Sequence, residues 1–193
     1  MPKIARDSLL TLEAYSRERQ HLRERVMSHK KVRKVLLNDN INLIFEDEMT
    51  VRYQIQEMLR VERIFEEERI CDELDAYNPL VPDGRNFKAT MMLEYTDPEV
   101  RRVWLERLIG IEDKVWVQVE GCQRVWAIAD EDLERENEKK TSSVHFLRFE
   151  LADEMVAGLK YGMSLSVGID HVHCQAAIEV VRETRDALIK DLA

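Results

Sequence analysis

Apolar and polar residues follow a helical period in the segment after residue 45. Four apolar residues recur there at spacings of three and four: Val51, Ile55, Met58 and Leu59. Residues at these spacings share one face of an α-helix, so the pattern predicts a helix that begins near Glu48. Glu62 follows Met58 by four residues and continues the same stripe. We therefore expect its carboxylate to face the core, where a charge needs a partner.

A strongly charged helix is expected before this segment. Asp7 or Ser8 can cap its start, and helical spacing continues over residues 17–37. Its apolar stripe is thin, which indicates a helix that lies on the surface of the domain or pairs with a second copy of the chain. A third helix is expected at about residues 66–77, since Asn78 precedes a proline and that position disfavours helical conformation.

Alternating apolar and polar residues predict strands in the rest of the chain. A short strand is expected at 41–46, others at 87–95, 144–151, 164–169 and 174–180, and a hairpin at 114–120 and 123–129. Short helices are expected at 99–109, 152–160 and 183–192. This order predicts an α+β fold, with a helical N-terminal third followed by a mainly antiparallel β-sheet with flanking helices and a C-terminal helix.

Length and composition bound the domain organisation. The 193 residues suffice for one domain with a sizeable core. We expect residues 1–80 to form a helical region with one short strand and residues 81–193 to form the sheet region, both within one compact domain. No apolar run is long enough for a membrane span or a signal peptide, and the three cysteines form no CxxC pair. These features favour a cytoplasmic protein with reduced thiols.

The net charge of −9 is unevenly distributed. Residues 17–34 hold eight Arg and Lys against Glu18 and Glu24, a local charge of +6. This basic segment is the obvious candidate for nucleic-acid binding, but the acidic remainder and the lack of interleaved aromatic residues argue against that function. Docking onto the acidic surface of a protein partner is the favoured interpretation.

Two histidines near the C-terminus have a spacing that suits a metal ion. In an extended strand His171 and His173 would face the same way, as two ligands of one ion would. A third ligand would have to come from elsewhere in the chain. The alternative is a pair of ordinary histidines that are hydrogen bonded near a turn. No cofactor can be assigned from the sequence.

An acid–base centre is a further candidate. His145 shares one face of its predicted strand with Leu147 and Phe149, so it is expected to be half-buried, and Glu57 or Glu62 could supply its carboxylate partner. The favoured alternative is a core histidine held by a backbone carbonyl. Arg148, on the other face, would serve a carboxylate from another element.

Several motifs together resemble a known family. They are the run FEDEMTVRYQIQEMLRVER, the segment ELDAYNPLVP, the strand end FLRFEL and the segment GIDHVH. With these motifs the chain resembles the bacterial domain-of-unknown-function family 3501 over nearly its whole length. Motif position selects these residues: Gln56, Glu57, Arg60, Glu62, Tyr77, Asn78, Arg148 and His171. The chain departs from the family pattern at Val172, where the family has proline.

The resemblance informs us about the organisation of the chain but not about a mechanism, because the family has no assigned activity. Genes of the family often lie beside genes for rubrerythrin and iron–sulfur oxidoreductases, which implies a role in peroxide or redox stress. We therefore expect a non-catalytic accessory protein that binds a redox partner of the rubrerythrin or iron–sulfur type. The alternatives are a small metal-dependent or acid–base enzyme that uses a Glu/His centre, and nucleic-acid binding through the basic helix.

Overall fold

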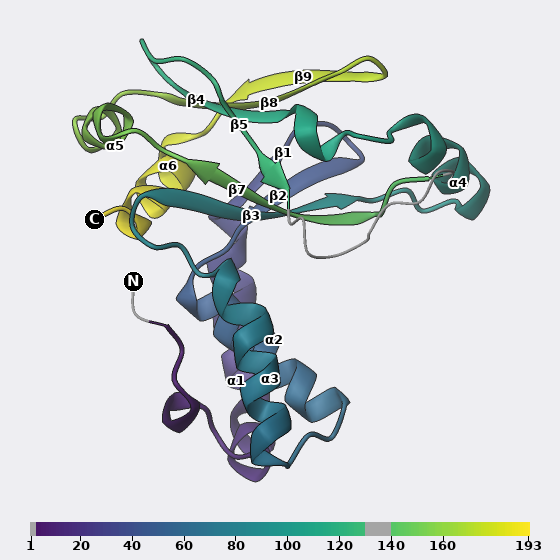
Figure 1. Cartoon of the computed structure of the whole chain (residues 1–193), viewed down its shortest axis with the longest axis vertical. Coiled ribbons are helices and arrows are strands. Elements are labelled where there is room, and N and C mark those ends of the chain that lie inside the picture. The colour runs from purple at the N-terminus through teal and green to yellow at the C-terminus, as the bar shows by residue number, and fades with distance from the viewer. Residues whose placement is uncertain (1–2, 130–139) are drawn as a thin grey trace.

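The computed structural model describes residues 3–129 and 140–193, and it consists of a helical stem and two stacked sheets (Figure 1). The sheets lie one above the other, and the stem projects from the side of the five-stranded sheet. This arrangement confirms the expected α+β class and its antiparallel pairing, but the strands form two sheets instead of the single sheet that was expected. Within the described residues, every helix is too short or too polar to cross a membrane.

The stem contains the N-terminal helices. It comprises a 3-10 turn at Arg6–Ser8, α1 (Leu12–Lys31), α2 (Glu48–Val61), α3 (Glu67–Tyr77) and a second 3-10 turn at Asn78–Leu80. Thr11 caps α1, because its side chain accepts a hydrogen bond from the Ala14 N–H. The predicted cap at Asp7 or Ser8 is therefore wrong, and those residues belong to the preceding 3-10 turn.

The five-stranded sheet joins strands from both halves of the sequence. Its order is β1-β2-β3-β7-β6, with these bounds: β1 (Lys34–Leu36), β2 (Ile41–Phe45), β3 (Asn86–Leu93), β7 (Val144–Glu150) and β6 (Ile128–Ala129). β1 lies within the predicted helix over residues 17–37, which ends instead at Lys31. The helix stops there because Val35 pairs with Leu43 of β2 and contributes to the core between the sheets.

The four-stranded sheet has the order β5-β4-β8-β9. Its strands are β4 (Val115–Val119), β5 (Val125–Trp126), β8 (Leu165–His171) and β9 (Cys174–Glu179). The expected hairpin is only half correct, because its second arm divides between the two sheets. β5 pairs with β4, whereas β6 crosses over to β7. Ala127, between them, still donates its N–H to Val115.

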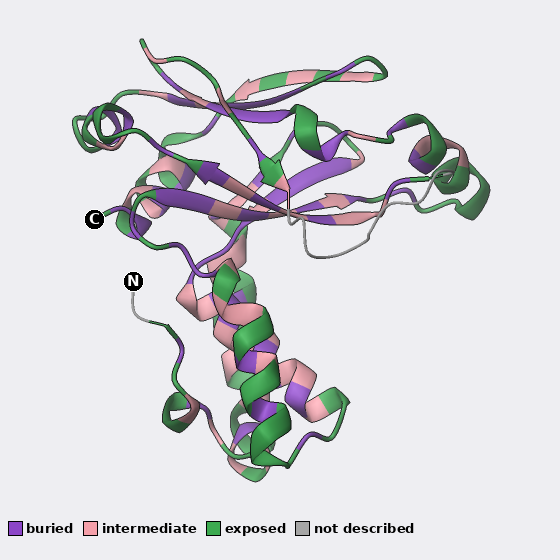
Figure 2. Cartoon of the chain, in the orientation of Figure 1, coloured by how far each residue is buried: buried purple, intermediate pink, exposed green. Residues whose placement is uncertain are grey.

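Among the described residues, the stem and the pair of sheets each have an apolar core of their own (Figure 2). The larger core lies between the sheets and includes alternate residues of each long strand. The smaller core lies in the stem and holds Val51, Ile55 and Leu59 of α2 against Ile70 and Leu74 of α3. The apolar stripe that the sequence placed on α2 is therefore its buried face.

The remaining helices flank the sheets. They are α4 (Pro98–Arg107), a 3-10 turn at Glu112–Lys114, α5 (Asp153–Lys160), α6 (Arg182–Leu188) and a last 3-10 turn at Ile189–Asp191. Asp97 caps α4, and Pro98 occupies its first turn. The predicted C-terminal helix is shorter than expected, since its last turn is a 3-10 turn.

Gly168 permits a close approach on the outer face of β8. A Cβ at this position would lie 2.3 Å from the ring of Trp116 and 2.5 Å from the backbone oxygen of Ala176. The oxygen belongs to the ladder of β9 and cannot move freely. We predict that Gly168→Ala lowers the free energy of unfolding by about 3 kcal/mol in a urea titration, because the substitution overpacks this face. Ser166→Ala, on the same face of β8, is the control and should change it far less.

Candidate functional site

A concavity of the stem lies between α1 and α2. A cavity of about 270 Å³ opens there, and we call it the stem groove. Its lining comes from both helices and from the N-terminal segment: Ser8, Leu10, Tyr15, Leu22, Arg25, Val26, Glu48, Met49, Arg52, Tyr53 and Gln56. An open recess beside it is lined by His21, Glu24, Ser28 and His29 and shares Arg25 and Met49 with the groove. The two form one continuous surface along α1.

Side-chain amides hold the N-terminal segment that forms one wall of the stem groove. Gln56 accepts a hydrogen bond from the Leu10 N–H (2.8 Å) and donates to the Leu10 oxygen (3.3 Å). Asn78 does the same for Ile4, at 2.8 and 3.1 Å. Each amide replaces the backbone partner that an irregular segment lacks. Gln56 and Asn78, which the resemblance selects, therefore have a structural role in this chain.

Glu57 holds α1 against α2. Its carboxylate accepts from the Tyr15 hydroxyl (2.6 Å), from Arg19 Nε and Nη2 (2.7 and 2.8 Å) and from Arg60 (3.4 Å). The Arg19 hydrogen bonds are the main reason why the pKa of Glu57 falls to about 2. Burial and the adjacent carboxylate raise the pKa of Tyr15 above its usual value. Glu57 is consequently a poor proton acceptor near neutral pH.

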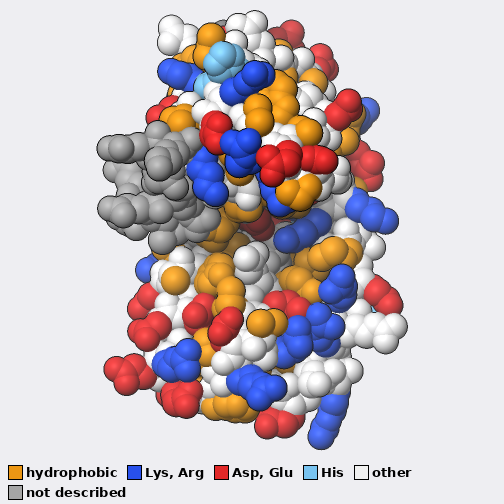
Figure 3. Space-filling view, turned by 90° about the vertical axis from the view of Figure 1, so that its right-hand side faces the viewer, with side chains coloured by type: hydrophobic (Ala, Val, Ile, Leu, Met, Phe, Trp, Pro, Cys, Tyr) orange, Lys and Arg blue, Asp and Glu red, His pale blue; other side chains and the backbone are white. Residues whose placement is uncertain are grey.

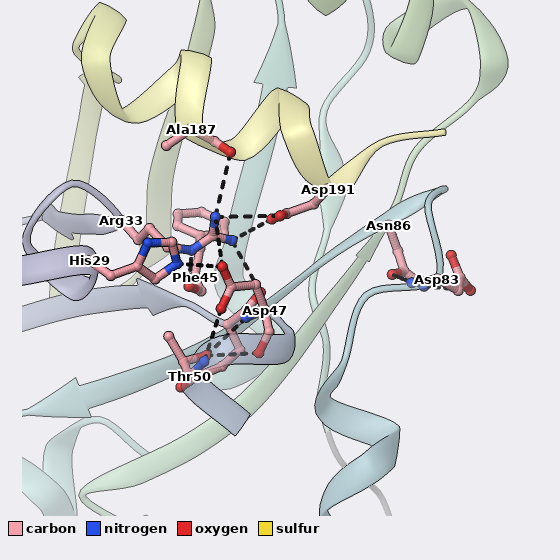
Figure 4. A network of polar contacts seen from close by, with 10 residues as sticks. His29, Arg33, Phe45, Asp47, Thr50, Asp83, Asn86, Ala187 and Asp191 are labelled. Carbon is pink, nitrogen blue, oxygen red and sulfur yellow. Dashed lines mark hydrogen bonds and ion pairs between the residues drawn. The ribbon is translucent and has the colours of Figure 1, made fainter. Parts of the chain in front are cut away.

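A second polar network, centred on Arg33, joins the stem to the sheets (Figure 4). Arg33 is only 1% exposed. Its guanidinium donates to the backbone oxygens of Phe45 (2.8 Å) and Glu46 (3.2 Å), and it forms ion pairs with Asp191 and Asp47. Asp47 also contacts His29 of α1. Four elements thus meet at one side chain: the ends of α1 and β2, the start of α2, and the C-terminal turn.

The two carboxylates of this network respond differently to burial. Burial opposes the charge of Asp47, but Arg33, the Thr50 N–H and His29 together outweigh burial, so the pKa of Asp47 lies below its usual value. For Asp191, burial is the larger effect and raises its pKa, although Arg33 partly offsets it. Asp47 and Thr50 also form a capping box that starts α2.

Glu62 is not buried, and the prediction that its carboxylate faces the core is wrong. α2 ends at Val61, and Glu62 is an exposed C-cap residue. The next residue, Arg63, has a φ of 53°, which turns the chain away from the helix axis. Ile64, the residue after Arg63, is buried in the stem core.

His145 is a buried residue of β7 that faces the core with Leu147 and Phe149, as its spacing predicted. Its Nε2 lies 3.0 Å from both the Thr141 hydroxyl and the Ser142 backbone oxygen, and its Nδ1 lies 3.9 Å from Glu112. These partners belong to the sheet part of the molecule, whereas Glu57 lies in the stem. The structure does not bring His145 together with Glu57 or Glu62.

The two C-terminal histidines are not in one extended strand. His171 ends β8, but His173 lies in the two-residue turn that leads to β9. His171 contacts the Ile109 backbone oxygen through Nε2 (3.1 Å) and accepts from the His173 N–H through Nδ1 (3.2 Å). Both ring nitrogens of His171 are thus engaged. Among residues 3–129 and 140–193, no three His, Cys, Asp or Glu side chains form a group that could hold a metal ion.

The other two residues that the resemblance selects lie apart from the stem groove. Arg148 pairs with Glu150 of its own strand, not with a carboxylate from another element as expected. Tyr77 packs against the stem core at the end of α3. Arg60 contacts Glu57 and belongs to the network described above.

The residues that shape the site were partly detectable in the sequence. Asp47 and Thr50 have the spacing of a capping box, which marks the start of α2. Arg33 carries no such signal, because its partner Asp191 lies 158 residues away. Arg25 belongs to the basic segment, yet only the packing of α1 on α2 shows that it faces a cavity.

Comparisons with known proteins identify a family whose function is unknown. The family model described as "Protein of unknown function (DUF3501)" matches residues 3–192. The fold is similar to the crystal structure of a novel protein of unknown function from Burkholderia pseudomallei, with 52% sequence identity, a TM-score of 0.95 and coverage of 100% of both chains. The search of curated proteins finds no match.

The first prediction from this site concerns Arg33. Replacement by Met leaves Asp191 buried without its cation, so we expect Arg33→Met to lower the free energy of unfolding by about 3 to 5 kcal/mol in urea. Adding Asp191→Leu should restore part of the loss, because the uncompensated charge is removed. Arg23→Met, at an exposed position of α1, serves as the control. Equal stability of Arg33→Met and Arg23→Met would contradict the role of Arg33 as the junction.

The second prediction concerns pH. The pKa of Glu57 is about 2 in the folded chain, whereas an unperturbed glutamate has a pKa of 4.5. Its ion pairs therefore stabilise the fold above pH 4.5, and this contribution is lost as the pH falls towards 2. Glu57→Gln should lower the free energy of unfolding by about 1 kcal/mol at pH 6, as for a partly solvated ion pair. Its difference from the wild-type chain should shrink in acid.

The matched control for this experiment is Glu68→Gln on the exposed surface of α3, which corrects for the loss of one negative charge. Both variants are unfolded in urea at each pH between 2 and 6. A Glu57→Gln difference that is constant over this range would show that the carboxylate does not stabilise α1 against α2.

Proposed function

Because this chain belongs to the DUF3501 family of proteins of unknown function, we propose its role from its own surface. It is a non-catalytic accessory protein that binds an acidic partner protein through α1 and the stem groove. The partner is a redox protein of the rubrerythrin or iron–sulfur class, as the family resemblance implies. The observation that carries the proposal is a set of cations on α1 that make no ion pair or hydrogen bond with the residues that the structure describes.

Five basic side chains of α1 have no hydrogen bond or ion pair with any described residue: Arg17, Arg23, Arg25, Lys30 and Lys31. Several arginines elsewhere on the surface are paired. Arg102 of α4 contacts Glu99 and Glu106, and Arg185 of α6 contacts Asp186. Unpaired cations on one helix of a chain with net charge −9 create a local positive potential that attracts an acidic surface.

The stem groove adds an apolar contact to this charge. Leu10, Leu22 and Met49 line it together with the rings of Tyr15 and Tyr53. Such a cavity accepts an apolar side chain of a partner, and a buried apolar anchor supplies most of the binding energy at many interfaces. The cations at its edge would then orient the partner through its carboxylates.

The surface around the stem is consistent with docking. Figure 3 shows one side of the molecule, where the surface is hollowed between the sheets and the stem and hydrophobic side chains gather at the hollow. On this side of the stem, positive and negative side chains are intermixed. We place the binding surface on α1 and the stem groove because of the cations of α1 named above.

The placement of the other candidate residues also supports a binding role. Glu57 is committed to Arg19 and Tyr15, and His171 is engaged at both ring nitrogens. Neither lines the stem groove. A Glu/His centre would require these side chains to meet around one cavity, and they are held in different parts of the fold.

Capture of partners from cell extract tests the proposal. The wild-type chain should retain a rubrerythrin-class or iron–sulfur protein, identified by mass spectrometry, and Arg25→Glu should reduce its recovery about tenfold or more by placing repulsion at the groove edge. Arg85→Glu carries the same charge change at an exposed arginine outside the stem groove and should bind as wild type. Added salt should weaken capture.

Three results would overturn this proposal. One is recovery of no electron-transfer or peroxide-reducing protein. Another is equal recovery by Arg25→Glu and wild type. The third is loss of all capture after nuclease treatment, which would assign the basic helix to nucleic acid instead.

A further inference from the structure

β9 is the last strand of the four-stranded sheet, and no described strand lies on its outer side (Figure 1). In an antiparallel pair, only every second residue exchanges backbone hydrogen bonds with the neighbouring strand. The Val180 N–H donates to Leu165 at 2.7 Å, and the register continues through Ile178 opposite Val167 to Cys174 opposite His171. The even-numbered residues of β9 therefore bond to β8.

The odd-numbered residues of β9 face the open edge. The N–H and C=O groups of Gln175, Ala177 and Glu179 point away from β8, and these three residues are exposed. Proteins commonly protect such an edge with lysine, proline or a β-bulge. The strand reads CQAAIE, without lysine or proline, and its six pairs with β8 are continuous, so it contains no bulge. The edge is open to a further strand.

We propose that β9 pairs antiparallel with β9 of a second copy of this chain, about a twofold axis at Ala177. In this register Ala177 faces the partner subunit's Ala177, and Gln175 faces the partner subunit's Glu179. The outward N–H and C=O groups of the three residues then bond across the axis. The two four-stranded sheets become one continuous sheet, and the interface is isologous.

The side chains favour this register over its neighbours. Two small alanines meet at the axis, and each Glu179 lies opposite an amide that can donate a hydrogen bond to it. Moving the axis by two residues to Glu179 would place two carboxylates opposite each other, which is unfavourable. Moving it to Gln175 would leave Glu179 outside the paired region and reduce the number of backbone hydrogen bonds.

Two exposed valines flank the edge and support the same pairing. Val172 is 80% exposed in the turn before β9, and Val181 is 67% exposed after it. In the proposed register Val181 lies opposite the partner subunit's His173, and Val172 lies opposite the partner subunit's Arg182. Both ends of the strand would therefore be covered. The stem projects from the other side of the molecule, so this pairing leaves the stem groove free and does not depend on the proposed function.

Disulfide trapping tests the register directly. In a background in which the exposed Cys71 is replaced by Ser, Ala177→Cys should form a covalent dimer on mild oxidation, because residues paired at a twofold axis have Cα atoms about 5.5 Å apart. Gln175→Cys alone should not, since its two copies are offset by four residues, about 13 Å. A mixture of Gln175→Cys and Glu179→Cys should again cross-link.

Sedimentation measures the association without cross-linking. The wild-type chain of 22.8 kDa should sediment as a dimer. Ala177→Pro should raise the dissociation constant about 100-fold, because each copy loses a central donor, while the monomer keeps its circular dichroism since that N–H does not bond to β8. Ala177→Ser should remain dimeric. A wild-type monomer at about 0.1 mM, or equal cross-linking of Ala177→Cys and Gln175→Cys, would overturn the proposal.

Discussion

The buried guanidinium of Arg33 is the constraint on which the arrangement of the whole chain depends. A cation that is 1% exposed must be fully compensated, and its partners come from the end of β2, the start of α2 and the C-terminal turn. The stem and the sheets have separate apolar cores, so hydrophobic packing alone does not fix their relative position. The directional contacts of Arg33 supply that fixation, and they also tie the last residues of the chain to its first third.

The stem depends on a second set of polar contacts of the same kind. Glu57 joins α1 to α2, while Gln56 and Asn78 hold the irregular N-terminal segment through its backbone groups. These residues resemble a functional constellation in the sequence, because polar side chains on an otherwise apolar helix suggest a site. In the structure their hydrogen bonds are used to assemble the stem. What the assembly leaves for binding is the stem groove and the unpaired cations beside it.

Local patterns in the sequence were sufficient to predict most of the helices and strands. The period of α2 and the proline after α3 are short-range signals, and each predicted its element to within a few residues. The failures required long-range information. β1 forms only because β2 pairs with it, and the segment after Gly121 divides between two sheets. Glu62 lies outside the core because α2 ends at Val61, one residue before it, and Glu62 is the exposed C-cap residue. The groove edge at Arg25 likewise depends on how α1 meets α2.

The charged side chains of this molecule have two distinct roles. Those that form ion pairs stabilise the fold, and those without a described partner are available for binding. Arg33 and Arg19 are engaged by carboxylates from distant elements, so their removal acts on folding. The basic residues of α1 that have no described partner cost little to the fold, and they remain available to an acidic surface. The backbone groups at a free sheet edge are likewise available to a partner. Backbone groups that have no neighbouring strand among the described residues, as on the outer side of β9, are directional and specify a register, whereas unpaired cations give attraction without one. The two proposed surfaces would therefore suit different partners: a second copy of the chain at β9 and an acidic protein, in a salt-sensitive contact, at α1.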